Sequence, residues 1–278
     1  LPLGGTRLEL VGIREIALPA LSSADVEALV DAQVDPYPSG ARLRRVAAAR
    51  SEGNPFYVEE LVRALRDQGR LVLHDGRYEL APEAELAVPP TIAALIAARI
   101  DRLPAPARDL LADAATLGVR FPLAHLRALA DSERVEEDLG LLERRGLLDR
   151  QSDGPVASCA FRHVLTHEVV RGGMLQAERQ ARHRRAAEML ERLYRGRTQE
   201  VADFLGHHWA SSDARVRAVP YLVAAADGAV AVGANREAIG HLEATLDLVA
   251  QRAVEIPEPA LAGLKLRLAG LHFIVGER

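Results

Sequence analysis

Histidine and carboxylate side chains that could bind a metal ion stand together at two places in the sequence. His163, His167 and Glu168 have the helical spacing i, i+4, i+5, but no third ligand follows at a spacing typical of a protein zinc site. His207 and His208 are adjacent. Adjacent side chains on a helix diverge by about 100°, so at most one of the two can face a core. We therefore expect no metal site of the chain's own.

Phosphate chemistry would need a glycine-rich cradle with a lysine and an acidic position for Mg²⁺. The pattern G-x-x-x-x-G-K-[ST] is absent, and Lys265, the only lysine, stands in the predicted helix AGLKLRL. The stretch LVLHD at 71–75 places an acid after apolar residues, but it leads into a turn. The arginine-rich stretch RQARHRR at 179–185 is interpreted as a solvated helix face. We expect that this chain alone does not hydrolyse ATP.

Gly53-Asn54-Pro55 opens a predicted helix with unusually complete start signals. Asn54 is a good N-cap, and Pro55 at the first helical position lacks a donor that would have no partner there. An apolar stripe follows at i, i+3, i+4 and i+7, formed by Val58, Leu61, Val62 and Leu65. Phe56 lies roughly opposite that stripe, so we expect a second apolar surface near the positive end of the helix dipole.

Composition indicates an ordinary water-soluble protein of more than one core. The chain has 278 residues, of which 49% are hydrophobic and 27% charged, with a formal net charge of −4. This charge argues against a protein that coats nucleic acid or a membrane surface. The single cysteine, Cys159, excludes an internal disulfide, and we expect it to lie inert in a core in a reducing, cytoplasmic setting. There is no basic N-terminal segment and no run of 18 apolar residues, so we expect no membrane partner.

Turn and cap residues divide the first third of the chain into short elements. Residues 6–18 alternate and then run apolar, which predicts a strand like the last one of an α/β domain. Ser22 or Ser23 would cap the helix that follows, and a second helix begins at Ser39 or Gly40. Two alternating segments within 70–80 flank Asp75-Gly76 and predict a hairpin. Because position 1 is not Met, we expect these elements to continue a longer protein.

From residue 89 onward the pattern changes to helices, one further hairpin and then helices alone. Gly118 and Gly146 mark helix ends, and Ser132 with Glu136 has near capping-box spacing at the start of the helix that ends at Gly146. The segment LLDRQSDGPVASCAFRHV predicts two strands joined at Asp153-Gly154. Three helices and a wing-like hairpin have the order of a winged-helix domain. The later helices suggest a solenoid, with one good tetratricopeptide-like helix at 233–248.

These motifs in this order resemble the C-terminal half of a STAND-class signal-transduction P-loop ATPase, as found in MalT-like or LuxR-type regulators and beside bacterial adenylate cyclases. The residues that carry the resemblance are EGNPFYVEELVRAL, the winged-helix pattern, FRHVLTHEVV and the trailing helix pairs. It implies a mainly α fold that begins with the end of an α/β nucleotide-binding domain. The implied parts are a terminal strand at 1–20, a helical lid with a β-hairpin at 21–88, a winged-helix domain at 89–163 and a TPR-like superhelix at 164–278.

The resemblance also implies half of an ATP/ADP site. Gly53, Asn54 and Pro55 match the Gly-x-Pro motif of the family, in which the proline ring lies against adenine. His163 stands where a histidine of the family reaches the β-phosphate of ADP, with Arg162 beside it as a second phosphate donor. Val164 replaces the aspartate that usually follows. The remaining nucleotide contacts would come from an upstream P-loop domain of the same protein.

Three functions remain open from the sequence. The favoured one is the regulatory part of a nucleotide-switched ATPase that binds a protein or small-molecule effector on its helical repeats. The second is a winged-helix DNA-binding regulator. Its recognition helix would carry Glu133, Glu136, Glu137, Asp138 and Glu143, so we do not expect direct DNA contact. The third is a helical-repeat scaffold for protein interaction, in which the Gly-Asn-Pro motif has no nucleotide role.

Overall fold

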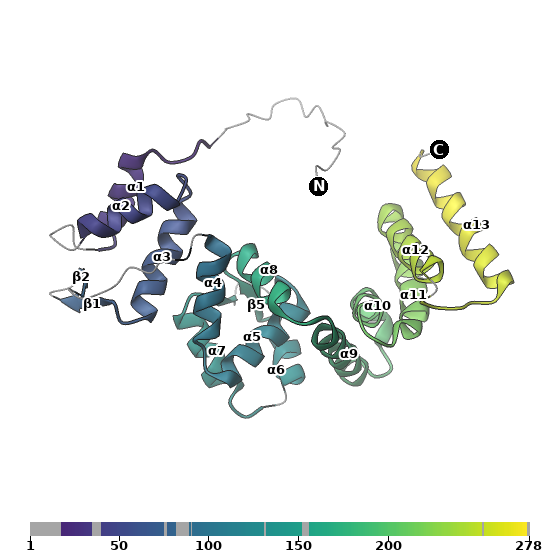
Figure 1. The fold of residues 1–278 in the computed structure, drawn as a ribbon. Coiled ribbons are helices and arrows are strands. Elements are labelled where there is room, and N and C mark those ends of the chain that lie inside the picture. The colour runs from purple at the N-terminus through teal and green to yellow at the C-terminus, as the bar shows by residue number, and fades with distance from the viewer. Residues whose placement is uncertain are drawn as a thin grey trace. The chain divides into compact units, whose positions relative to one another are not determined.

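The chain is mainly helical and divides into two compact units, Leu1–Leu95 and Ile96–Arg278 (Figure 1). The computed structural model describes residues 18–34, 40–74, 77–81, 89, 91–130, 132–151, 156–251 and 253–276. The strand expected at 6–18 lies outside these residues apart from Leu18, and so do both predicted turns, Asp75-Gly76 and Asp153-Gly154. Each unit has a hydrophobic core of its own.

The first unit combines short helices with a two-stranded antiparallel sheet. Its described elements are α1 (Ser23–Asp31), α2 (Gly40–Arg50), α3 (Pro55–Asp67), β1 (Leu71–His74) and β2 (Arg77–Leu80). Ser22 caps α1 in a complete capping box with Asp25, as the sequence predicts. The predicted stripe of α3 is buried and packs against α1 and α2, which confirms the periodicity argument.

The second unit begins with helices interleaved with a small antiparallel sheet. Its first elements are α4 (Ile92–Asp101, which starts in the first unit), α5 (Ala105–Leu117), β3 (Arg120–Pro122), α6 (Leu123–Ala130), α7 (Val135–Arg144), β4 (Leu148–Gln151) and β5 (Ser158–Phe161). The strand order is β3-β5-β4, with Phe121 opposite Cys159 and Leu148 opposite Phe161. The pair β4–β5 confirms the predicted strands. The short β3 was not predicted, because three residues carry no readable alternation.

The start of α7 differs from the predicted capping box. The helix begins at Val135, and the Ser132 hydroxyl accepts the backbone N–H of Arg134 before the helix starts. Glu136 does not fold back onto a cap. Its carboxylate accepts hydrogen bonds from Arg127 and Arg150, at 2.7 and 2.8 Å. Two arginines outside α7 therefore bind the carboxylate that a capping box would use, which the sequence spacing could not show.

The rest of the second unit is a succession of helices. They are α8 (Val164–Gly173), α9 (Gln176–Leu193), η1 (Thr198–Val201), α10 (Ala202–Ala210), η2 (Arg215–Arg217), α11 (Ala218–Ala231), α12 (Asn235–Ala250) and α13 (Glu258–Val275). From α9 to α13 each α-helix packs on the next (Figure 1). Gly206 permits one close crossing, because a Cβ there would lie 2.7 Å from a side-chain carbon of Leu222. None of the helices in the described part of the chain has the length and apolar character needed to cross a bilayer.

A cluster around the buried Trp209 ring joins α9, α10, η2 and α11. The Trp209 ring is fully buried, and its Nε1–H donates to the Glu191 carboxylate at 3.0 Å. Glu191 also accepts from Arg217 at 2.8 Å and from the Tyr221 hydroxyl at 2.8 Å. The Arg217 guanidinium lies 3.7 Å from the centre of the Trp209 ring, which is a cation–π distance. Four side chains thus fix the packing of three successive α-helices.

Candidate functional site

Gly53-Asn54-Pro55 forms the predicted helix start. The Asn54 Oδ1 atom accepts the backbone N–H of Phe56 at 3.0 Å, and Pro55 is the first residue of α3. Pro55 is exposed and Phe56 is half-buried, whereas the next residue, Tyr57, is buried. The Asn54 cap therefore holds the exposed, apolar ring of Pro55 at the N-terminus of the helix, where a ligand could contact it.

Gly53 has a structural role that no other residue type could fill unless the neighbouring backbone moved. Its φ is 75°, in the region that glycine tolerates, and it is buried. Its carbonyl accepts the backbone N–H of Leu21 at 2.8 Å. A Cβ at this position would lie 2.5 Å from the Leu21 carbonyl oxygen. The glycine therefore lets the segment before α1 lie directly against the start of α3.

Arg162 and His163 lie in the second unit, at the end of β5 and the start of α8. Arg162 is exposed and binds Asp149 through two parallel hydrogen bonds of 3.0 and 2.7 Å, so a phosphate would have to compete with this carboxylate. His163 is half-buried at the N-cap position of α8, and its side chain makes no capping bond. The three predicted residues at the start of α3 belong to the other unit. The structure therefore describes the two groups of predicted nucleotide-binding residues separately.

Cys159 lies in a core as the sequence predicts, and His167 has a structural role that the sequence did not predict. The His167 Nε2 atom lies 3.0 Å from the Ala115 carbonyl oxygen, and its ring packs edge-on against Phe161. Burial lowers the pKa of His167, so the ring is neutral at physiological pH. Cys159 is fully buried, and burial raises the pKa of its thiol to about 11. Neither residue is available as a ligand or nucleophile.

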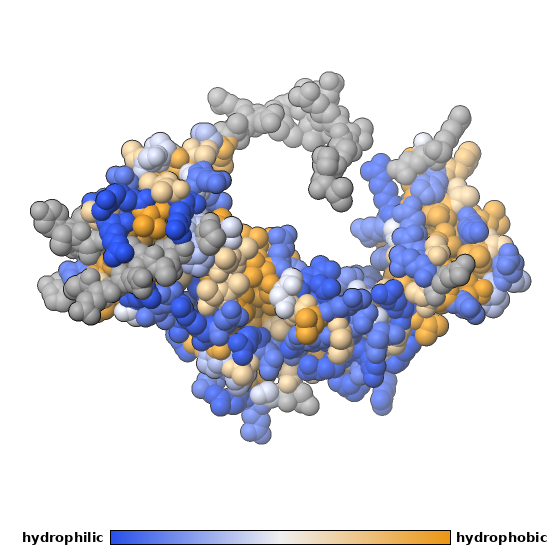
Figure 2. Space-filling model, in the orientation of Figure 1, coloured by the Kyte–Doolittle hydropathy of each residue, from blue (hydrophilic) through white to orange (hydrophobic). Residues whose placement is uncertain are grey.

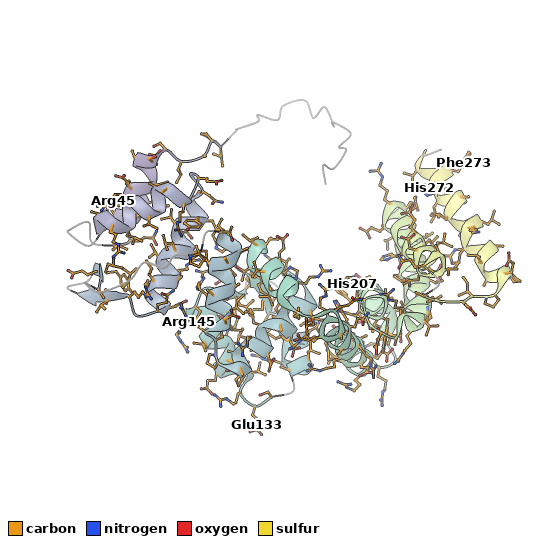
Figure 3. All side chains as sticks on the ribbon, in the orientation of Figure 1. Arg45, Glu133, Arg145, His207, His272 and Phe273 are labelled. Carbon is orange, nitrogen blue, oxygen red and sulfur yellow. The ribbon has the colours of Figure 1, made fainter. Side chains whose placement is uncertain are left out.

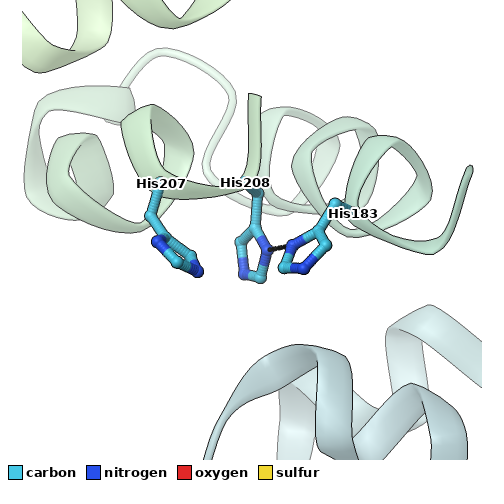
Figure 4. Close-up of side chains that lie close together, drawn as sticks. All are labelled: His183, His207 and His208. Carbon is cyan, nitrogen blue, oxygen red and sulfur yellow. Dashed lines mark hydrogen bonds between the residues drawn. The ribbon is translucent and has the colours of Figure 1, made fainter. Parts of the chain in front are cut away.

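Three histidines from two helices form a cluster that the sequence did not predict. His207 and His208 lie on α10 and His183 lies on α9, and one ring nitrogen from each comes within 4.8 Å of the other two. The Nδ1 atoms of His183 and His208 are 2.9 Å apart and share a hydrogen bond (Figure 4). His183 and His208 are buried, whereas His207 is exposed. The expectation that only one of the adjacent histidines faces a core is therefore confirmed.

Burial keeps the His183 and His208 rings of this histidine cluster neutral. It lowers the pKa of His183 to about 4, with a smaller contribution from the positive charge of neighbouring groups. It lowers the pKa of His208 well below 6.5. The surrounding protein atoms and the charge of Arg171 also lower the pKa of His207, although water at this exposed residue limits the effect. At pH 7 all three rings can therefore offer a nitrogen lone pair.

A signal for His183 was present in the sequence but was not recognised. His183, Ala186, Ala187 and Leu190 have the spacing i, i+3, i+4, i+7 and are all buried, so His183 lies on the core-facing stripe of α9. Within the stretch 179–185, Arg184 and Arg185 are exposed, as expected for a solvated face, whereas Arg179 and Arg182 are half-buried and His183 is buried. The helix that His183 meets could not be read from spacing alone.

No family model and no curated protein matches the chain.

Proposed function

We propose that this chain is the regulatory part of a STAND-class signal-transduction ATPase, comprising the lid, a winged-helix domain and a helical sensor region. One observation carries the proposal: α5, β3, α6, α7, β4 and β5 follow one another with sheet order β3-β5-β4. This is the element order of a winged-helix domain, and it follows directly on a helical unit that begins α3 with Gly-Asn-Pro. The sequential packing of α9 to α13 supports the helical-repeat region.

The nucleotide-binding role of the lid is supported by the exposure and fixed position of Pro55. The Asn54 cap holds the backbone at this point, and Gly53 anchors the preceding segment. A proline ring has a flat apolar face without an N–H donor, which suits contact with a purine. We assign Pro55 to the adenine and His163 to the β-phosphate of ADP, with the P-loop supplied by an upstream domain of the same protein.

An effector surface on the helical region is supported by exposed apolar side chains on the last described helix. Leu266, Phe273 and Ile274 of α13 are 76%, 86% and 66% exposed. Hydrophobic residues lie among hydrophilic ones on the surface around α13 (Figure 2), and Phe273 projects from the helix (Figure 3). Exposed apolar groups of this size commonly mark sites of association with another protein or ligand.

The surface of α7 argues against a direct DNA-binding function. Glu136 and Glu137 at the start of this helix are exposed, and so is Glu133, which projects outward from the loop before it (Figure 3). Arg150 is already held by Glu136 and by Glu143, at 2.8 and 2.7 Å. A helix with this charge would repel the phosphates that line the major groove.

The test is retention of ADP by the longer protein that carries this chain together with its P-loop domain. We expect Pro55→Ala and His163→Ala each to release ADP faster in a nucleotide-chase assay, because each removes one contact with the bound nucleotide. Pro106→Ala is a matched control, since Pro106 is an exposed proline in the first turn of α5. Unchanged release in both site variants would refute the assignment, and ATP hydrolysis by the present chain alone would refute the division of roles.

A further inference from the structure

The geometry points to a metal-binding site formed by His183, His207 and His208, which would take one divalent transition-metal ion of the Zn²⁺ class. This inference does not depend on the proposed nucleotide switch, because the site lies entirely on α9 and α10 within the second unit. Three imidazoles from two packed helices would make the ion a cross-link between them.

The spacing of the three rings suits a shared ion. Their centres form a nearly equilateral triangle with sides of 5.2, 5.4 and 5.6 Å. A tetrahedral ion bound to ring nitrogens at about 2.0–2.1 Å would place neighbouring ring centres roughly 5 Å apart. All three rings extend to the same side of the two helices (Figure 4). The side-chain positions therefore need only small rotations to converge on one point.

The separation of the nitrogen atoms shows which rotation is needed. Nitrogens around a tetrahedral Zn²⁺ lie about 3.3 Å apart. The two facing Nδ1 atoms of His183 and His208 are 2.9 Å apart and would separate slightly. One nitrogen of each ring lies within 4.8 Å of one nitrogen of the other two, so the nitrogen of His207 would move closer. His207 is exposed, so its side chain has room to make this adjustment.

The protonation chemistry is also compatible with metal binding. Two neutral imidazoles that face each other through Nδ1 share one hydrogen, which one ring donates to the other. For both Nδ1 atoms to bind the ion, that hydrogen moves to the Nε2 atom of its own ring. The neutral rings lose no proton in this step, so an ion at pH 7 competes with a hydrogen bond and not with bound protons.

Charged side chains near the histidine cluster act on a bound cation in both directions. The arginine side chains of Arg171 and Arg179 add positive potential at His183, and Arg171 also does so at His207. Asp203, one turn before His207 on α10, acts in the opposite direction. Arg171 and Asp203 are both exposed, so water screens their effects. Three protein ligands with an exposed edge leave a fourth position for water, the composition of an open zinc site.

The test uses the full chain, stripped of metal with a chelator, dialysed, and then titrated with Zn²⁺ against a chromophoric chelator. We expect one ion per chain. Co²⁺ should give the intense visible bands of a four-coordinate site, and Zn²⁺ should raise the unfolding temperature reported by Trp209 fluorescence. Failure of the native chain to bind one equivalent of either ion would overturn the inference.

His207→Ala is the decisive variant, because His207 is exposed and its removal leaves no cavity in the core. We expect at least about a tenfold loss of Zn²⁺ affinity and loss of the Co²⁺ bands, with the unfolding temperature of the metal-free chain unchanged. His241→Ala, which removes a half-buried histidine on α12 outside the histidine cluster, should bind as the native chain does. His207→Gln provides a second variant with a polar side chain. Native affinity in both His207 variants would exclude the site.

Discussion

Replacing Gly53 with alanine should lower the stability of the first unit by more than the cost of backbone strain alone. A side chain at φ 75° costs about 1–2 kcal/mol because Cβ meets the backbone. The new Cβ would also lie 2.5 Å from the Leu21 carbonyl oxygen, 2.8 Å from the Ala20 Cβ and 2.9 Å from the Leu21 nitrogen. Two of these three atoms belong to backbone, so the segment before α1 must move.

That movement would also break the hydrogen bond from the Leu21 N–H to the Gly53 carbonyl, at a further cost of about 0.5–1.5 kcal/mol. We therefore expect a total loss of about 1.5–3.5 kcal/mol in the stability of the first unit. Gly69→Ala is the matched control. Gly69 follows the other end of α3 with φ 65°, but a Cβ at this position would have no atom of the described residues within 4 Å. It should lose only the strain component, about 1–2 kcal/mol.

Hydrogen exchange of the α3 amides measures this difference in one unit. Any stabilisation from a less flexible unfolded chain is common to both alanine variants and cancels in the comparison. Trp209, the only tryptophan, lies in the second unit, so its fluorescence transition in urea should remain unchanged and serves as an internal control. Equal protection of α3 in Gly53→Ala and Gly69→Ala would refute the packing argument.

Three further predictions concern the second unit. Trp209→Ala should destabilise this unit by about 3–5 kcal/mol in urea unfolding, because it empties a fully buried site and removes the hydrogen bond to Glu191. Phe204→Ala, at a residue that is 44% exposed, should cost less than about 1 kcal/mol. Similar losses in the two variants would contradict the prediction. Burial lowers the pKa of His183 from 6.5 to about 4, so the unfolded chain binds more protons below pH 6.5 and stability should fall as the pH drops from 6.5 to 4. This residue alone should cost about 2 kcal/mol at pH 5 relative to pH 7.5, and an equal urea midpoint at both pH values would argue against a neutral buried ring. Because burial raises the pKa of Cys159 to about 11, the native thiol should react with a thiol reagent at pH 8 far more slowly than the thiol in urea; equal rates would show that it is accessible.

Local signals in the sequence were sufficient for most helices and for two pairs of strands. The Ser22 cap, the Asn54-Pro55 start and the ends at Gly118 and Gly146 act within a few residues, so their physics is visible in the order of residue types. The buried stripe of α3 follows from the helical period in the same way. Such features need no knowledge of what the helix packs against.

Features that depend on a distant partner were missed or misread. The strand β3 exists because it pairs with β5, about 40 residues later in the chain, and it is too short to show a pattern of its own. The capping box expected at Ser132 and Glu136 does not form, because Arg127 and Arg150 bind the glutamate. Gly53 was interpreted as part of a helix start, whereas its contact with Leu21 gives the stronger reason for a glycine.

The sequence by itself determined that this chain is mainly helical, where most of its helices begin and end, and that it contains no lysine-bearing phosphate cradle. Only the tertiary structure decided which histidines meet. His183 and His208 are 25 residues apart, and their nitrogens come to 2.9 Å because α9 and α10 pack together. Helical periodicity determines the direction in which a side chain points around the axis of its helix. Which two helices come into contact depends on how their whole surfaces fit.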